Sequence, residues 1–526
     1  MTRKLRWLGI AAIVLVVGSA LSVFSYGRFA HYARGAPSQA IAADRIETPV
    51  DRAIAPMTQA RPGEAGLSLI NDNLDAFAVR ALSAGVAGRS LDLQYYIWKP
   101  DLTGNLIVHK ILRAADRGVR VRLLLDDLNA HKKDSVLAAL DQHHNVEVRM
   151  FNPSRARASS FMRGVEMLLR FFSLNRRMHN KAWIVDGRIA VVGGRNIGDE
   201  YFGASSESNF MDADLAVVGP PVQETAAIFD AFWNSPSAIP LSALVDSDQE
   251  ALQRLRRIVD LEYQSRDAHP YLVKLRQSPT IAALLRGEKQ PRWTRDAHVY
   301  SDPPAKADGA PRKGWLADVL VPAATGARRE LLIISPYFVP GDEGVAALVA
   351  MRKRGVRVGV LTNSLAATDV AAVHGGYAPY RLPLLKGDVD LYELMARGGH
   401  GGRGSGSSGG GSGFGSSDAS LHTKAFVADG NVGFVGSFNL DPRSINLNTE
   451  MGILFRDPQL SGDLLRTFEA KTSASNSYKL WLDDGELRWR DGSAQPPREW
   501  THEPAVGMGR RALARVIGWL PVESQL

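Results

Sequence analysis

The amino-acid sequence predicts an α/β protein made of two duplicated halves, each a mixed, largely parallel β-sheet flanked by helices. The pattern His-x-Lys-x-x-x-x-Asp begins at His179 and again at His422, and in both copies Gly and Asn follow the Asp by seven and ten residues. The string Gly-Val-Arg-Val also occurs twice, beginning at Gly118 and Gly355. The two strings lie 237 residues apart and the two histidines 243. Because these separations nearly agree, the duplication covers a whole half and not the motif alone.

Both halves alternate strand-like and helix-like stretches, an order that forms parallel βαβ units in a covered sheet. In the first half, the predicted helices cover 72–87 and 105–117, and the predicted strands cover 91–98, 118–126 and 146–151. In the second half, a helix is predicted over 344–354 between strands over 331–338 and 355–362. The same layout therefore occurs in both halves.

Each motif is expected to lie at the start of a strand that ends in a tight turn. Alternate side chains of a strand share a face, so His179 and Lys181 point the same way, as do His422 and Lys424. Apolar residues then lead to Asp-Gly pairs, which predict turns. A second apolar strand follows each turn and ends at a pair of small residues, where the backbone can approach a ligand closely.

Residues 1–34 are predicted to be a membrane anchor or a signal segment. Basic residues at 3, 4 and 6 precede an uncharged, largely apolar run over 7–27, which is long enough to span a bilayer as a helix. A cleaved signal peptide is the alternative, because small residues near 18–22 could serve a peptidase. The basic start favours a cytoplasmic N-terminus, with the rest of the chain across the membrane.

The remaining boundaries follow from composition. Residues 35–60 are expected to be a tether, 61–290 the first half and 291–526 the second, with the seam within 285–300. Residues 398–417 have no counterpart in the first half and hold eleven Gly and six Ser. This composition buries too little apolar surface to offset the entropy of ordering, so it predicts a mobile loop. The loop is either a lid over the site or a neutral surface insertion.

Charge and cysteine content limit the partners. A formal net charge of +8 over 526 residues suits an anionic partner, whether a lipid surface or nucleic acid. The chain has no Cys, which excludes disulfides and thiolate metal sites.

The paired motifs resemble the signature of the phospholipase D superfamily. Within it, the chain is similar to bacterial cardiolipin synthases of the third type, the cardiolipin synthase C-type proteins. The stretches that carry this second resemblance are 91–98, 101–104, 123–128, 177–181, 192–202, 373–381 and 440–444. The resemblance implies two phospholipase D-like halves packed with one active site at their interface.

A phosphodiester resists attack because its charge repels nucleophiles and its alkoxide leaves poorly. A neutral His can attack phosphorus and become a phosphohistidine while a protonated His donates to the leaving oxygen; the resemblance assigns these roles to His179 and His422. We expect neither a metal ion nor another cofactor. The other predicted site residues are Lys181, Lys424, Asn196, Asn439 and Ser437 around the non-bridging oxygens, Asp214 and Glu450 as the carboxylates that orient the imidazoles, and Asp186 and Asp429, which complete the catalytic motifs and are expected to support the fold of the site.

The resemblance also implies a reaction, phosphatidyl transfer to phosphatidylglycerol from a second phospholipid, which is phosphatidylglycerol or phosphatidylethanolamine. The expected location is a bacterial inner membrane, with an N-terminal anchor and the catalytic part on the periplasmic side. The same residues would serve a hydrolase that releases phosphatidic acid. A nuclease of the superfamily suits the basic charge but not the anchor, so we expect no nucleic acid partner. A catalytically inactive scaffold is disfavoured by the complete motifs, and the sequence does not indicate an oligomeric state.

Overall fold

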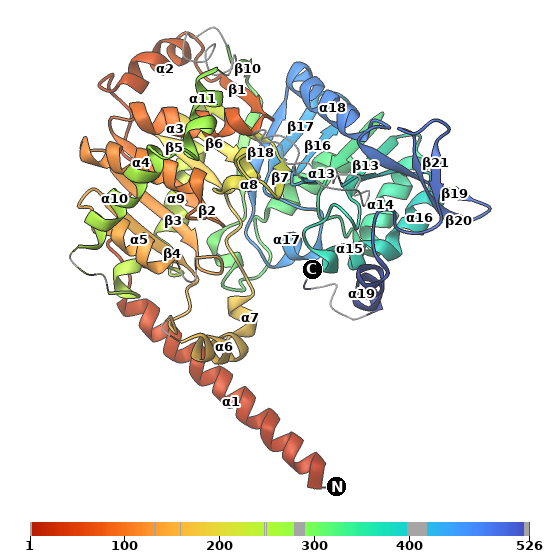
Figure 1. The fold of residues 1–526 in the computed structure, drawn as a ribbon, viewed down its shortest axis with the longest axis horizontal. Helices are drawn as coiled ribbons and strands as arrows, with labels where there is room; N and C mark the ends of the chain where they lie inside the picture. The colour runs from red at the N-terminus through yellow and green to blue at the C-terminus, as the bar shows by residue number, and fades with distance from the viewer. Residues whose placement is uncertain are drawn as a thin grey trace.

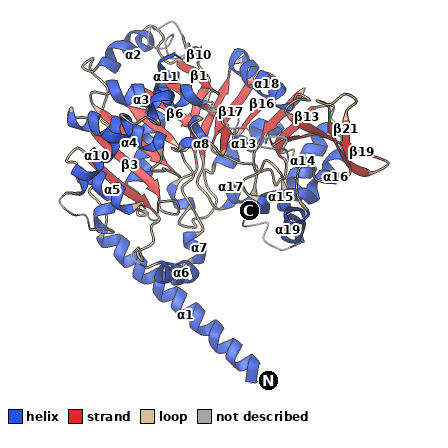
Figure 2. Ribbon diagram, viewed as in Figure 1, coloured by secondary structure: helices blue, strands red, loops and turns tan. Residues whose placement is uncertain are grey.

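The computed structural model describes residues 3–130, 133–157, 159–246, 248, 250–277, 290–396, 418–519 and 525. Two α/β halves lie side by side, and the N-terminal helix α1 (Arg3–Tyr32) projects away from them (Figure 1). The strands lie mainly inside each half, with helices around them (Figure 2). The predicted loop over 398–417 lies outside the described residues.

Each half contains one large sheet. The first has nine strands in the order β10-β1-β8-β6-β5-β2-β3-β4-β9, and the second has ten in the order β11-β18-β17-β16-β12-β13-β14-β19-β20-β21. The strands of the first sheet are β1 (Ala65–Ile70), β2 (Ser90–Tyr95), β3 (Arg120–Asp126), β4 (Val146–Phe151), β5 (Ala182–Val185), β6 (Ile189–Gly193), β8 (Asp214–Val218), β9 (Ala238–Pro240) and β10 (Arg292–Thr294). Those of the second are β11 (Ala297–Ser301), β12 (Glu330–Ile334), β13 (Arg357–Asn363), β14 (Asp390–Leu394), β16 (Ala425–Ala428), β17 (Val432–Gly436), β18 (Met451–Arg456), β19 (Ser477–Asp483), β20 (Glu486–Asp491) and β21 (Arg498–Trp500).

The pairing confirms two duplicated halves with mixed sheets. Strands β2, β3 and β4 run parallel, as do β12, β13 and β14. The other pairs in both large sheets are antiparallel among the described strands, including the two hairpins that follow the motifs, so both sheets are mixed with antiparallel pairs in the majority. Asp186 and Gly187 have φ of 52° and 65°, and Asp429 and Gly430 have 55° and 66°. Two successive positive φ values are the geometry of a type I′ β-turn, so the predicted turns are confirmed.

Helices surround both sheets. In the first half they are α2 (Pro49–Gln59), α3 (Asn73–Val86), α4 (Leu102–Asp116), α5 (Asp134–Asp141), α6 (Ser160–Leu169), α7 (Phe171–Leu174), α8 (Asp199–Phe202), α9 (Pro220–Trp233), α10 (Ala251–Tyr263) and α11 (Ala268–Gln277). In the second half they are α13 (Leu316–Thr325), α14 (Gly341–Lys353), α15 (Ala371–Tyr377), α16 (Arg381–Lys386), α17 (Pro442–Asn446), α18 (Pro458–Thr472) and α19 (Met508–Trp519).

The halves share a hydrophobic core. One core lies between the first sheet and helices that include α3, α4 and α5, and another lies between the second sheet and α13 and α14. A third core contains Phe229 and Trp233 of α9 together with Ile453 and Phe455 of β18. Burial of apolar surface from both halves in one core stabilises their association. A small third sheet of β7 (Ser208–Met211) and β15 (Asp418–Leu421) also joins the halves.

The chain passes from the first sheet to the second between two short strands. Strand β10 belongs to the first sheet and β11 to the second, so the crossing lies at residues 295 and 296. The segment over 35–60, expected to be a tether, lies against the first half. The Ser38 and Ala40 amides donate to Asn234 and Asp230, and α2 begins at a capping box formed by Thr48.

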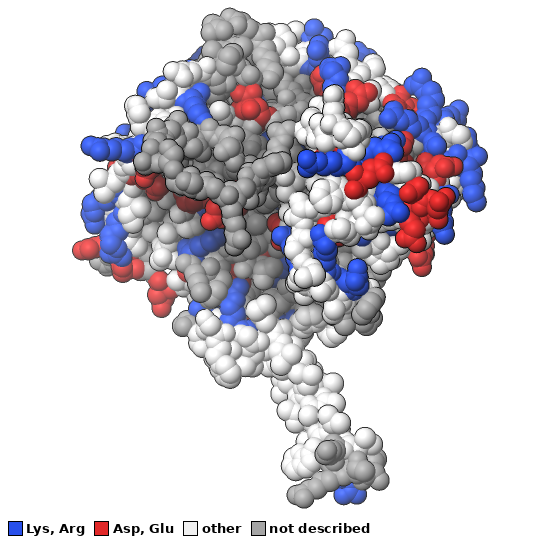
Figure 3. Space-filling view, turned by 45° about the vertical axis from the view of Figure 1, so that its right-hand side comes forward, with Lys and Arg blue, Asp and Glu red and all other residues white. Residues whose placement is uncertain are grey.

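Helix α1 meets the length and composition needed to cross a bilayer. Within its stretch Leu5–Tyr32, the 18-residue window that meets the test has a mean hydropathy of 2.3 and no residue buried against the rest of the protein. Among the described residues, it is the one helix that meets these criteria. Figure 3 shows an uncharged rod between the tip of α1 and the body.

Candidate active site

The two motif histidines are held by crossed contacts between the halves. The His179 amide donates to the Thr449 carbonyl at 2.8 Å, and His179 Nδ1 lies 2.8 Å from the carboxylate of Glu450. In the same way, the His422 amide donates to the Met211 carbonyl at 2.8 Å. His422 Nδ1 lies 2.5 Å from the Asp212 carboxylate. Each imidazole is therefore oriented by a carboxylate from the other half, which places the site at the interface.

The prediction that Asp214 orients an imidazole is wrong. Its carboxylate is buried between Arg80, at 2.9 Å, and Arg195, at 3.3 Å. Sheet register explains the difference: Gly193 pairs with Asp214, whereas its counterpart Gly436 pairs with Gly452. The counterpart of Glu450 is thus the residue two positions before Asp214, which is Asp212.

The small residues after the second strand make room for these carboxylates. A Cβ on Gly194 would lie 2.4 Å from an Asp212 carboxylate oxygen, closer than any side chain permits. At the equivalent place in the second half, the Ser437 hydroxyl donates to Glu450 at 2.5 Å, and Ser444 donates to the other oxygen at 2.9 Å. Ser437 thus contacts the orienting carboxylate, whereas its predicted phosphate contact stays a prediction.

The two lysines occupy equivalent buried positions. Lys181 Nζ donates to the His179 carbonyl at 2.7 Å, and Lys424 Nζ donates to the His422 carbonyl at 2.6 Å. Burial lowers the pKa of both ammonium groups, and the charge of Lys424 further lowers the pKa of Lys181. A bound anion would oppose both effects. No three His, Asp or Glu side chains form a metal-binding group within the described ranges.

The two motif asparagines differ in their contacts. Asn196 Oδ1 accepts from the Ile97 amide at 3.0 Å, and its Nδ2 donates to the Tyr201 hydroxyl at 2.9 Å. Asn439 is also buried, but its Oδ1 has no hydrogen-bond partner among the residues that the structure describes. An unpaired buried amide oxygen is costly, so the second half offers a polar group that a ligand could satisfy.

Electrostatics distinguish the two His–carboxylate pairs. Burial and the charges of Lys181 and Lys424 hold the pKa of His179 well below its usual value, so its ring is neutral at pH 7. Burial also raises the pKa of Glu450 to about 7. In the other pair, burial favours the protonated carboxyl, yet the neighbouring His422 and Lys424 hold the pKa of Asp212 below its usual value. Burial and Lys424 hold the pKa of His422 below its usual value, although Asp212 opposes them.

Sequence patterns did not reveal the rings that pack on the histidines. The Tyr96 ring lies edge-on to His179 with a centroid distance of 5.0 Å. Tyr201 and Phe210 lie 5.3 Å and 5.1 Å from the ring of His422. Tyr96 and Tyr201 lie within the stretches 91–98 and 192–202 that resemble cardiolipin synthases, but no sequence pattern links either ring to a histidine.

Asp186 and Asp429 lie in the hairpin turns, at the opposite end of the motif strands from His and Lys. The Asp186 carboxylate accepts from three successive backbone amides, those of residues 88–90, at 2.8–3.0 Å. The Asp429 carboxylate does the same for residues 328–330, at 2.7–3.1 Å. Both side chains therefore hydrogen-bond the turn to the start of a neighbouring strand, β2 for Asp186 and β12 for Asp429. Neither carboxylate contacts an imidazole among the hydrogen bonds of the described residues.

We expect Asp186→Asn to lower the free energy of unfolding by about 2 kcal/mol, because three backbone amides lose a charged acceptor. Asn tolerates the positive φ of this turn. The matched control is Asp388→Asn, at an exposed Asp that also has a positive φ of 59°, where we expect little change. Denaturant unfolding checks both variants. Loss of activity in Asp186→Asn with unchanged stability would instead place Asp186 in the chemistry.

The paired halves and crossed His–carboxylate contacts define a phospholipase D-type enzyme. A family model described as "Cardiolipin synthase, PLD-like domain" matches residues 84–233 and 320–472, once in each half. The chain belongs to this family, within the phospholipase D superfamily, and is an enzyme of the phosphatidyltransferase class.

Individual relatives agree with this assignment. The chain is 41% identical over 473 residues to cardiolipin synthase C of Escherichia coli (strain K12). This alignment covers 90% of this chain and 98% of that protein. It is 24% identical over 421 residues to a cardiolipin synthase of Oceanobacillus iheyensis, which covers 80% and 71%. The solved structure of phosphatidylserine synthase from Haemophilus influenzae Rd KW20 aligns over 95% of this chain and 99% of that one, with a TM-score of 0.55 and 12% identity. This last likeness shows the shared two-half fold.

Proposed function

We propose that this protein is a membrane-anchored cardiolipin synthase that carries a phosphatidyl group on His179 and passes it to phosphatidylglycerol. The observation that carries the proposal is the crossed pairing, which sets two histidines and two buried lysines at one interface. The donor is phosphatidylglycerol or phosphatidylethanolamine. The expected location is a bacterial inner membrane, with α1 as the anchor and the two halves on the periplasmic side.

The first step forms a phosphorus–nitrogen bond. Glu450 holds Nδ1 of His179, so Nε2 is the nitrogen that attacks phosphorus. The bond from phosphorus to the headgroup oxygen breaks, and protonated His422 donates to that oxygen as it leaves. Lys181 and Lys424 stabilise the charge on the non-bridging oxygens.

The second step reverses these roles. The glycerol hydroxyl of phosphatidylglycerol gives its proton to His422 and attacks phosphorus, and the bond to His179 Nε2 breaks. The buried amide of Asn439, whose oxygen is unpaired, is available to the reacting lipid. Water could attack the same intermediate and release phosphatidic acid. Membrane anchoring favours transfer because it raises the effective concentration of lipid hydroxyls at the site.

The test is product analysis in mixed micelles of phosphatidylglycerol, with and without phosphatidylethanolamine. We expect the wild-type protein to form cardiolipin and His179→Ala to form none. His144→Ala is the matched control, because this His is exposed, and it should keep full activity. Phosphatidic acid as the main product would make the protein a hydrolase. No lipid turnover by the wild-type protein would contradict the proposal.

A further inference from the structure

Helices α6 and α7 expose an uncharged and largely apolar face. Between residues 160 and 172, the exposed residues are Ser160, Phe161, Met162, Gly164, Met167, Leu168, Phe171 and Phe172. The Phe161 and Phe172 side chains are 78% and 84% exposed. A contiguous apolar surface of this kind marks an interaction site on a protein.

The charged residues of these helices point inward. Arg163 pairs with Asp127 at 3.3 Å. Glu166 accepts from the Ser154 hydroxyl at 2.7 Å and pairs with Arg170 at 2.7 Å. A helix on a water-facing surface shows the opposite arrangement, with apolar residues inside and charges outside. The inversion indicates that the medium beyond α6 and α7 is apolar.

The α6–α7 face adjoins the membrane helix. A Cβ on Gly18 of α1 would lie 3.2 Å from Leu169 of α6, and the Arg170 guanidinium lies 3.3 Å from the centroid of the Tyr26 ring. Gly18 is ten residues before Arg28, where the uncharged run ends. At 1.5 Å per residue, this places the contact about 15 Å inside that end, near half the thickness of a bilayer core. If α1 spans the bilayer, α6 therefore lies level with one leaflet.

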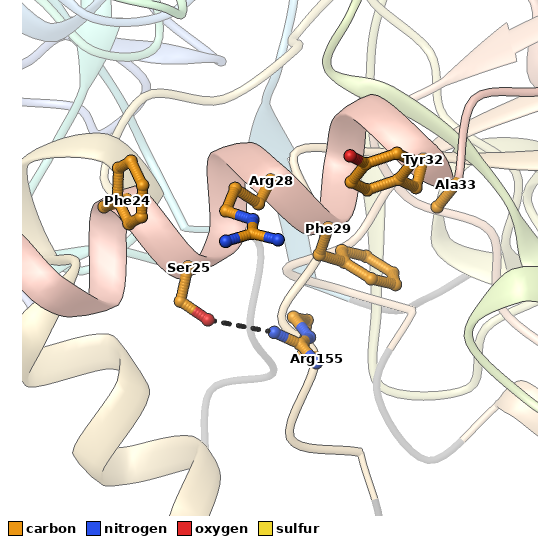
Figure 4. Close-up of a pocket in the computed structure, with 7 residues that line it drawn as sticks. All are labelled: Phe24, Ser25, Arg28, Phe29, Tyr32, Ala33 and Arg155. Atoms are coloured by element: carbon orange, nitrogen blue, oxygen red, sulfur yellow. Dashed lines mark hydrogen bonds between the residues drawn. The ribbon is translucent and has the colours of Figure 1, made fainter.

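Two arginines mark the expected height of the lipid headgroups. Arg28 and Arg155 line an open pocket at the C-terminal end of α1, together with aromatic residues (Figure 4). The Arg155 guanidinium lies 4.6 Å from the centroid of the Phe29 ring and donates to Ser25 at 3.4 Å. Arginines at the boundary of an apolar segment place their charge among lipid phosphates. The Leu169 contact with Gly18 lies seven residues before Ser25 along α1, so α6 lies on the acyl-chain side of this pair.

We propose that α6 and α7 are embedded alongside α1 among acyl chains, in the leaflet on the same side of the membrane as the active site. The inference rests on the proposed membrane function and adds a second point of insertion. Four residues separate Leu174, the last of α7, from His179, so the two can be at most about 17 Å apart. Embedding α7 therefore holds the segment that carries His179, just before β5, close to the headgroups that it must reach.

The absence of native Cys allows one fluorophore to be placed at a chosen residue. We would label Phe172→Cys with nitrobenzoxadiazole and reconstitute the full chain in vesicles of phosphatidylglycerol and phosphatidylethanolamine. Lipids with a nitroxide on the acyl chain should quench this label strongly, and aqueous iodide should not. The matched control is Leu261→Cys on α10, which is 70% exposed and should show the reverse pattern.

Two other outcomes would overturn the inference. Quenching of the Phe172 label by iodide but not by the nitroxide lipids would place the face in water. Protection from both quenchers would mean that a second copy of the chain covers it. Acyl-chain quenching in a protein that forms no cardiolipin would refute the proposed function and leave the embedding intact.

A second experiment asks whether embedding serves catalysis. Phe161→Asp combined with Phe172→Asp should reduce cardiolipin formation in vesicles by about tenfold or more, because carboxylates are disfavoured among acyl chains. Activity in detergent micelles should stay unchanged, since these residues lie outside the site. Wild-type activity of the double variant in vesicles would contradict a role in reaching the bilayer. So would an equal loss of activity in vesicles and in micelles.

Discussion

His422→Ala is expected to abolish turnover of natural phospholipid while leaving His179 able to react once with an activated substrate. A headgroup alkoxide is a poor leaving group, so losing the general acid should slow cardiolipin formation by about 10²–10⁴-fold. A p-nitrophenyl ester of phosphatidic acid needs no proton donor. With this substrate, we expect a burst of about one nitrophenolate per protein and a phosphatidyl adduct on His179, because the second step lacks its base.

The matched variant is His179→Ala, which should give neither the burst nor the adduct. The two His environments are the physical basis for this asymmetry. Burial and nearby lysines hold the pKa of His179 well below its usual value, which favours a neutral nucleophile. Burial and Lys424 also lower the pKa of His422, but the Asp212 carboxylate beside it raises that pKa and so favours the imidazolium. A burst in His179→Ala but not in His422→Ala would exchange the two roles, and no burst in either would argue against a phosphohistidine.

Local sequence patterns predicted the parts of this fold that depend on neighbouring residues. The strand expected over 146–151 coincides with β4, and the strand expected over 118–126 overlaps β3 (Arg120–Asp126). The Asp-Gly turns were predicted for the same reason, because positive φ values at two adjacent residues strongly limit the residue types. The duplicated motifs then located one histidine and one lysine in each half.

Features that depend on register or on distant contacts could not be predicted in this way. Asp212 and Asp214 lie two residues apart, and only the pairing of Gly193 with Asp214 shows which of them is the counterpart of Glu450. The connection from Asn196 to Asp212 is longer than that from Asn439 to Glu450, so spacing does not decide. The α6–α7 face also escaped prediction, because its helical period is ordinary and only the tertiary structure shows which side is exposed.

Asp212→Asn and Asp214→Asn should separate activity from stability. Asp212→Asn removes the charge that orients His422 and supports its protonated form, so we expect cardiolipin formation to fall by about 10³-fold or more. Asp214→Asn leaves Arg80 and Arg195 without a buried counterion, and the free energy of unfolding should fall by about 3–5 kcal/mol. Kinetics and denaturant unfolding of both variants check this. Similar losses of stability in both would mean that Asp212, too, is chiefly structural.

The pH profile offers a sharper test of Asp212, because a structural role would not move it. His422 must be protonated to act as an acid, so activity should fall as pH rises through its pKa. Burial and Lys424 lower that pKa, and Asp212 is the foremost charge that raises it. Without the carboxylate the pKa falls further, so the alkaline limb of kcat/KM should move to lower pH in Asp212→Asn. Asp214 contacts Arg80 and Arg195, so its variant should keep the wild-type limb. An unchanged limb in Asp212→Asn would mean that another group is the acid.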